Sequence, residues 1–204
     1  LLTITQGVTI QKSQLGGGSP IIRGFEANRV LLVVDGVRMN NAIYRSGHVQ
    51  NSITVDPNAL EIVEVVFGPS STIYGSDALG GVVHFYTKKP EFSKNDKTYY
   101  KTSAEVRFGT AADEYSFHVS NNIGWDKVAN FLSFTVKEFG DLRMGKWRKH
   151  GYDNWGLVTH YIENDEMVVN EDPNIQVGTG YKQFDVLNNT SWRVNENVFI
   201  RFNN

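Results

Sequence analysis

The sequence contains no cysteine, and its positive and negative charges nearly balance. The absence of cysteine excludes disulfide bridges, cysteine-zinc sites and thiol nucleophiles. The net charge of -2 provides no clustered basic excess, which binding to a nucleic acid or to an anionic membrane surface would require. We therefore expect no nucleic-acid partner.

Long apolar runs and catalytic motifs are also missing. The sequence has no stretch of about 18 apolar residues, which excludes a transmembrane helix but leaves membrane β-strands open, because such strands alternate apolar and polar residues. Neither G-x-S-x-G nor H-E-x-x-H occurs. The acidic stretch 163–172 lacks the glycine spacing and the final glutamate of a calcium loop. These absences predict that the chain is not an enzyme.

The most informative segment is 61–83, which reads EIVEVVFGPSSTIYGSDALGGVV. An apolar strand is followed by a Gly-Pro break, a short Ser/Tyr segment and several glycines before a second apolar strand. The glycines permit positive φ or close backbone approach, and Pro69 fixes the turn after the first strand. The segment predicts a rigid connection of small residues between two buried strands.

Two upstream segments, 17–24 (GGSPIIRG) and 28–38 (NRVLLVVDGVR), repeat this pattern of short strands and glycines. Together the three segments resemble the plug domain of TonB-dependent outer-membrane receptors, in the order and spacing of that family over residues 7–90. The resemblance implies an α+β plug domain followed by the first antiparallel strands of a transmembrane β-barrel. Because the chain starts at Leu1 and stops within an expected strand, we expect a fragment of a larger receptor, without the N-terminal part of the plug.

The expected plug occupies residues 1–90, followed by a linker at 91–98 and five barrel strands within 99–204. The continuous apolar runs at 30–34 and 62–67 favour strands that are covered on both faces. A short helix is expected at 56–60, with Asp56 as its N-cap and Pro57 in its first position.

Beyond residue 98 the apolar residues recur with period two, in stretches near 100–108, 115–125, 132–137, 183–194 and 198–202. In the third stretch, for example, Leu132 and Phe134 alternate with Ser133 and Thr135. The connections are short except for a loop of about forty residues near 140–180, and this inequality is typical of outer-membrane barrels.

If the first strand rises from the periplasm, the long loop is extracellular. Trp125 and Trp192 then fall at the periplasmic strand ends on the lipid-facing side, where an aromatic girdle belongs. Alternation alone fits a soluble antiparallel sandwich equally well. The resemblance to the plug domain favours the barrel.

The polar stretch 39–52 lies between expected buried strands and corresponds to the plug apex that faces the ligand in similar receptors. Its sequence looks most like that of the heme and hemoprotein receptors, which implies that His48 helps to hold heme iron. Imidazole is a natural axial ligand of heme iron. Tyr44 and Arg45 are candidates to stack on heme or to pair with its propionates. The alternative is that His48 is an ordinary solvent-exposed loop histidine.

The resemblance also implies that Arg23 contacts the barrel wall, although many family members carry a second arginine where this chain has Phe67. His84 stands where many members have asparagine, and we expect a structural role for it. The long loop carries Arg143, Trp147 and His150, candidates to help capture an anionic ligand or a hemoprotein. Charged residues in loops are, however, usually just solvated.

The function implied by the resemblance is energy-coupled nutrient uptake across the outer membrane of a Gram-negative bacterium. The implied partners are the TonB-ExbB-ExbD machinery, outer-membrane lipid and a heme, hemoprotein or siderophore ligand. Heme would be a transported ligand, and no permanently bound cofactor is expected. The alternatives are a ferric siderophore, vitamin B12 or glycan receptor of the same family, and a surface receptor that signals or adheres without transport.

Overall fold

The computed structural model describes residues 6–11, 18–26, 29–39, 52–68, 71–75, 78–95, 97–110, 113–147 and 151–204. These residues form two compact units. The first comprises the described parts of Leu1–Ala104, together with His118–Thr135 and Asp185–Asn204. The second comprises the described parts of Glu105–Phe117 and Val136–Phe184.

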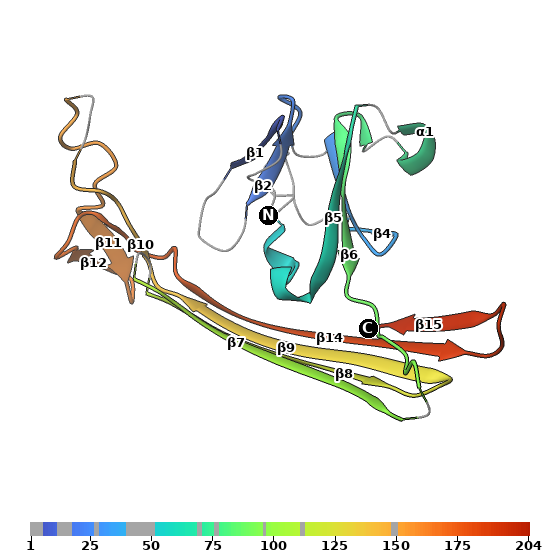
Figure 1. Cartoon of the computed structure of the whole chain (residues 1–204). Coiled ribbons are helices and arrows are strands. Elements are labelled where there is room, and N and C mark those ends of the chain that lie inside the picture. The colour runs from blue at the N-terminus through green and yellow to red at the C-terminus, as the bar shows by residue number, and fades with distance from the viewer. Residues whose placement is uncertain are drawn as a thin grey trace. The chain divides into compact units, whose positions relative to one another are not determined.

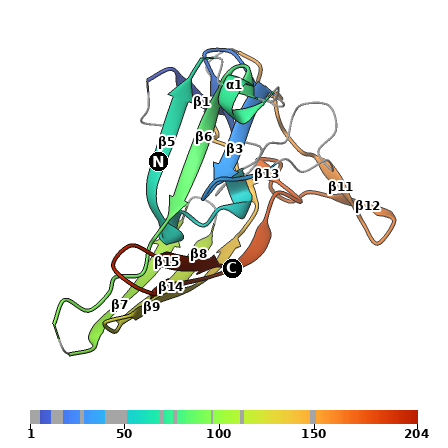
Figure 2. The same cartoon turned by 90° about the vertical axis from the view of Figure 1, so that its right-hand side faces the viewer.

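The N-terminal part of the first unit contains two small sheets. Strands β1 (Val8–Gln11) and β2 (Ser19–Ile22) pair in antiparallel fashion. The second sheet has the order β4-β3-β6-β5, and Figure 2 shows β3, β6 and β5 side by side. Its strands and the short helix α1 have the following bounds: β3 Val30–Val34, β4 Val37–Arg38, β5 Leu60–Phe67, α1 Ser71–Tyr74 and β6 Gly81–Thr87.

The central pair β3 and β6 is parallel and forms the core of this sheet. Val30–Val34 is buried except at its last residue, and β6 is buried except at Tyr86. Gly81 has a φ of +148°, and a Cβ there would lie 2.6 Å from the Val66 carbonyl oxygen. Glycine is therefore required where β6 begins beside β5, as the pattern of small residues predicted.

The prediction that residues 62–67 are covered on both faces is wrong. Strand β5 has no buried residue, and Ile62 is 57% exposed. The physical reason is its position, because β5 is the edge strand of the sheet and, among the described residues, pairs only with β6. An apolar run identifies a strand, but it does not reveal whether that strand lies at an edge.

The expected short helix is present as a single 3-10 turn, Pro57–Ala59. Asp56 is its N-cap and accepts a hydrogen bond from the Asn58 backbone N–H at 3.2 Å. Pro57 occupies the first position, where no backbone N–H is needed. Strand β5 starts directly after this turn, as predicted.

The remainder of the chain builds a five-stranded sheet in the order β15-β14-β9-β8-β7. Figure 1 shows its long strands. The five strands predicted from alternation are all present, with bounds β7 Tyr99–Gly109, β8 Glu114–Gly124, β9 Val128–Phe139, β14 Tyr181–Arg193 and β15 Phe199–Asn203. The connection between β9 and β14 is the predicted long one.

The two faces of the central strands have the opposite polarity to a water-soluble sheet. In β8, β9 and β14 the buried side chains are largely polar: His118, Ser120, Asn122, Ser133, Thr135, Asn189 and Ser191. The exposed side chains of the same strands include large apolar ones: Phe117, Leu132, Phe134, Phe184, Val186 and Trp192. Strand β7 lies at the sheet edge and is exposed or half-buried throughout.

The long connection belongs to the second unit and has structure of its own. Strand β10 (Leu142–Arg143) pairs with β13 (Ile175–Gln176). Between them, β11 (His160–Glu163) and β12 (Glu166–Val169) form a hairpin. The sequence did not predict these four strands. Among the described residues, no helix is long and apolar enough to cross a membrane.

Candidate functional site

The candidate ligand residues of the apex stretch, His48, Tyr44 and Arg45, lie outside the described residues, as does His150 of the long loop. Their roles therefore stay predictions. The structure describes three other candidates, which are Arg23, Arg143 and Trp147.

Arg23 follows β2 in a left-handed conformation, with a φ of 48°. Its backbone N–H donates to the Gly7 carbonyl oxygen at 3.0 Å. The guanidinium carbon lies 5.0 Å from the centre of the Phe67 ring, which is within the range of a cation–π contact. Phe67 thus serves as a partner of Arg23. Contact of Arg23 with a barrel wall stays a prediction.

The long-loop candidates differ in their surroundings. Arg143 forms an ion pair with Asp172, so its charge already has a partner within the loop. The pKa of Asp172 lies below its usual value, mainly because the Asn174 side chain and backbone N–H donate to its carboxylate, with Arg143 adding to the effect. Trp147 is 81% exposed and available for contact with a ligand. The expected capture of an anionic ligand stays a prediction.

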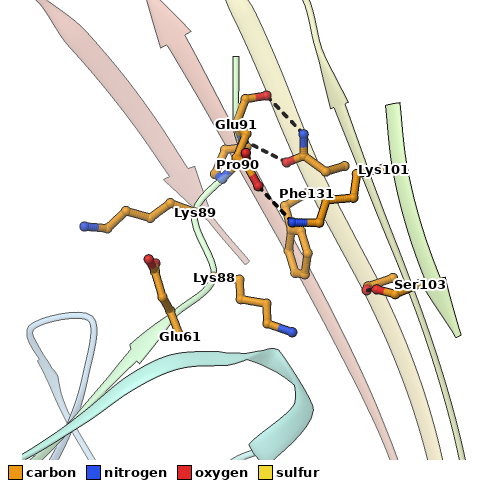
Figure 3. A pocket seen from close by; sticks show the side chains of 10 residues that line it. Glu61, Lys88, Lys89, Pro90, Glu91, Lys101, Ser103 and Phe131 are labelled. Atoms are coloured by element: carbon orange, nitrogen blue, oxygen red, sulfur yellow. Dashed lines mark hydrogen bonds and ion pairs between the residues drawn. The ribbon is translucent and has the colours of Figure 1, made fainter. Parts of the chain in front are cut away.

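A cavity of about 360 Å³ lies in the first unit, where the segment after β6 meets strands β7, β8 and β9. Lys88, Lys89 and Lys101 line it, but Figure 3 shows their ammonium groups pointing to different places. Lys101 lies 3.3 Å from the Glu91 carboxylate, and Lys88 donates to the Asn58 carbonyl oxygen at 2.8 Å. The ammonium groups point to different places and are largely paired, so these lysines connect neighbouring chain segments. They do not form a pocket for a single anion.

The linker is held at this cavity by a pair of hydrogen bonds between one side chain and the main chain. The Asn122 side-chain oxygen accepts from the Glu91 backbone N–H at 2.8 Å, and its nitrogen donates to the Glu91 carbonyl oxygen at 3.0 Å. The buried amide thus satisfies the linker backbone as a neighbouring strand would. The linker consequently has a defined position beside β8.

A second cavity, of about 270 Å³, also lies in the first unit and is lined by His84, Thr87 and Asn189. His84 is buried, its Nε2 accepts from the Gly36 backbone N–H at 3.0 Å, and its ring stacks on Tyr86 at 4.0 Å. The other ring nitrogen, Nδ1, is buried without a hydrogen-bond partner among the described residues, so the structural role expected of His84 stays a prediction. Among the residues that the structure describes, no three His, Cys, Asp or Glu side chains gather as a metal site.

Residues 1–82 match the sequence model of a family described as the TonB-dependent Receptor Plug Domain. The chain belongs to the TonB-dependent receptors. As predicted from the sequence, a plug domain is followed by antiparallel strands.

Relatives and solved structures of this receptor family agree with the assignment. The chain is 45% identical over 170 residues to the vitamin B12 transporter BtuB of Vibrio vulnificus (strain CMCP6), covering 77% of this chain and 26% of that protein. It is 31% identical over 145 residues to a hemin receptor of Yersinia enterocolitica, covering 67% and 20% respectively. The chain therefore spans about a quarter or less of the length of these curated relatives.

The FrpB iron transporter from Neisseria meningitidis (F3-3 variant) has a similar fold, with a TM-score of 0.70. The match covers 96% of this chain and 26% of that chain. The sequence identity is 15%, so this similarity concerns the fold alone.

The plug contacts the strands through residues that the sequence analysis did not single out as site residues. Asn189 of β14, which is 1% exposed, donates to the Thr87 hydroxyl and to the Lys88 carbonyl oxygen, both at 2.9 Å. Thr87 in turn donates from its hydroxyl and its backbone N–H to the Asp35 carboxylate. The signal in the sequence was the row of polar residues on one parity of each strand. That parity identifies a face, but it does not name the partners.

Proposed function

We propose that this chain is part of an outer-membrane receptor that takes up a nutrient in an energy-coupled manner, with heme or hemoprotein-derived iron as the favoured ligand. The observation that carries the proposal is the inverted polarity of the sheet that follows the plug. Polar side chains of β8, β9 and β14 are buried, while large apolar side chains are exposed. Exposure of apolar area to water is unfavourable, so lipid is the fitting environment for that face.

The strand ends support the same orientation in a membrane. Trp125 and Trp192 are each 44% exposed and lie at the same end of the sheet, where the Arg193 backbone N–H donates to the Lys127 carbonyl oxygen. Tryptophan is enriched at the boundary between lipid and water. This end is the periplasmic one in our proposal, and the long loop between β9 and β14 is extracellular.

The plug supplies the link to energy. Membership of the TonB-dependent receptors supports coupling to the TonB-ExbB-ExbD machinery of the inner membrane. Ligand binds between the plug apex and the extracellular loops, and the machinery performs the work that moves the plug. The receptor itself consumes no cofactor in this scheme, and heme enters as cargo.

The similarity to hemin receptors and the position of His48 favour heme as the ligand. Vitamin B12 is the second candidate, because the B12 transporter is 45% identical to this chain and the hemin receptors are 31% and 29% identical. Both ligands contain a metal ion held by a nitrogen macrocycle, so an imidazole and neighbouring aromatic groups suit either. A siderophore, a glycan or a signalling role without transport remains as a further alternative.

A hemin titration of the complete receptor in detergent tests the heme assignment. We expect a saturable, red-shifted Soret band in the wild type and a weaker band in His48→Ala, since the substitution removes an axial ligand. His160→Ala, a change at an exposed histidine of β11, serves as the matched control and should leave the band unchanged. Equal bands for wild type and His48→Ala would remove His48 from the site, and saturable binding of cyanocobalamin without binding of hemin would favour vitamin B12.

A further inference from the structure

Three buried polar side chains from separate segments of the first unit meet beneath the 3-10 turn Pro57–Ala59. They are Asp56 before the turn, His118 of β8 and Thr135 of β9, with exposed fractions of 8%, 5% and 0%. The Thr135 hydroxyl lies 2.5 Å from Asp56 Oδ2, and His118 Nδ1 lies 2.6 Å from the same hydroxyl. His118 Nδ1 is 3.9 Å from Asp56 Oδ2. We call this group the Asp56 cluster.

The direction of each hydrogen bond in the Asp56 cluster follows from the number of protons available. Thr135 donates its single hydroxyl proton to Asp56 Oδ2. The Thr135 oxygen can then only accept from His118, which places a proton on Nδ1 of the imidazole. The chain of donors therefore runs from His118 through Thr135 to Asp56.

The same carboxylate also holds the turn. Asp56 Oδ1 accepts from the Asn58 backbone N–H at 3.2 Å, while Oδ2 faces Thr135. One side chain thus joins the segment that leads into β5 to two strands of the following sheet. The hydrogen bond between Thr135 and Asp56 joins residues that are 79 positions apart along the chain. It therefore forms only when the plug lies against β8 and β9.

We propose that the Asp56 cluster is the anchor that seats this part of the plug and that it opens when the plug moves, with Asp56, Thr135 and His118 as positioning residues. This inference rests on the proposed function, in which energy from TonB displaces the plug. The free energy of a buried hydrogen bond to a carboxyl group depends steeply on alignment, because misaligned partners stay out of contact with water without gaining a full hydrogen bond. Once the groups separate, water replaces the lost partners, so the net stability gained is modest. Such a contact is specific when closed and can be released by a pull.

A local role for Asp56, as the cap of the 3-10 turn and nothing more, predicts different behaviour from an anchor. A cap would be weakened by Asp56→Ala but would not respond to the loss of the Thr135 hydroxyl. An anchor responds to both changes, and the two effects are not independent. A double-mutant cycle therefore separates the two roles.

The test uses the complete receptor with Ala59→Cys as the sole cysteine. Ala59 is 5% exposed, so its thiol reacts with a maleimide only when the turn lifts from the strands. We expect Thr135→Val to raise the labelling rate about tenfold, equivalent to about 1.4 kcal/mol. Thr135→Ser, which keeps a hydroxyl, should restore the slow rate. The control Ser133→Ala removes a hydroxyl from the same buried face of β9 and should change the rate less than twofold.

Asp56→Ala should raise the labelling rate at least as much as Thr135→Val, and the double variant should label no faster than Asp56→Ala alone. An unchanged rate in Thr135→Val would overturn the anchor, as would rates that simply multiply in the double variant. If Asp56→Ala does not fold, the series of Thr135 and Ser133 variants still decides the matter. None of these measurements requires a ligand or TonB.

The role of the Asp56 cluster in movement is tested in energised membranes. With ligand and active TonB present, the labelling of Ala59→Cys should rise above its resting rate. Uptake of ligand without any such rise would show that the anchor stays closed during transport and would overturn the inference. Slow resting labelling that depends on Thr135, in a receptor that shows no TonB-dependent uptake, would instead refute the proposed function and leave the seating contact intact.

Discussion

A lysine at Phe134 should reveal whether the apolar face of the sheet lies in lipid. Phe134 is the seventh of the twelve residues of β9 and is 40% exposed, so more than half of its surface is covered by neighbours. Both Phe134→Ala and Phe134→Lys lose the packing of the ring. The difference between the free energies of unfolding of the two variants therefore isolates the cost of placing the lysine charge at this position. In the middle of a lipid-facing strand that difference should be about 2–4 kcal/mol against lysine. In water it should be within about 0.5 kcal/mol.

The assay is urea unfolding of the complete receptor folded into fluid-phase lipid vesicles, with the free energy of unfolding compared between the two variants. Trp147→Ala and Trp147→Lys provide the control pair, since Trp147 is a highly exposed loop residue and both changes should have equal effects. Equal stability of Phe134→Ala and Phe134→Lys would place the apolar face in water and would favour the soluble sandwich over the barrel.

Three further predictions concern the plug and its contact with the strands. Gly81→Ala should prevent normal folding of the plug, measured by protease resistance, since the new Cβ would lie 2.6 Å from the Val66 carbonyl oxygen. The pKa of Tyr86 is raised above 10.0, chiefly because its phenol donates to the Glu64 carboxylate, so Glu64→Gln should lower it in a spectrophotometric titration referenced to Tyr86→Phe. The folded state retains that proton more tightly, so the associated stability should be present below pH 10 and lost as the pH rises through the raised pKa. Asn189→Ala should lower the free energy of unfolding by about 1–3 kcal/mol in urea titrations, because it removes the hydrogen bonds from the Asn189 side chain to the Thr87 hydroxyl and to the Lys88 carbonyl oxygen.

The elements that the sequence predicted correctly are those fixed by local chemistry. Alternation with period two located all five strands of the second large sheet, because a strand with two different environments must alternate its side chains. Asp56 followed by Pro57 predicted the start of the turn before β5, because an acceptor and a residue without an N–H suit those two positions. The requirement for glycine where β6 begins was also readable from the row of small residues.

The features that the sequence did not predict depend on contacts between distant segments. The exposure of β5 follows from its place at the edge of a sheet, which its own residues do not encode. The partnership of Asp56 with Thr135 and the contact of Arg23 with Phe67 depend on how separate strands pack, and no local pattern names such partners. Alternation placed Thr135 on the polar face of its strand, but only the fold shows what Thr135 and Asn189 bind.

In the proposed function, the complete receptor takes up a nutrient with energy supplied through TonB. The most direct measurement is uptake of hemin, with cyanocobalamin in parallel, by Gram-negative cells that lack their own receptors for both and express the complete receptor, with and without a functional TonB. We expect saturable uptake of hemin that disappears without TonB and falls in His48→Ala. Uptake of cyanocobalamin but not of hemin would agree with the proposed class of receptor and would identify vitamin B12 as the ligand. Uptake of hemin or of cyanocobalamin at the same rate with and without TonB would show that transport does not use TonB and would overturn the proposed function.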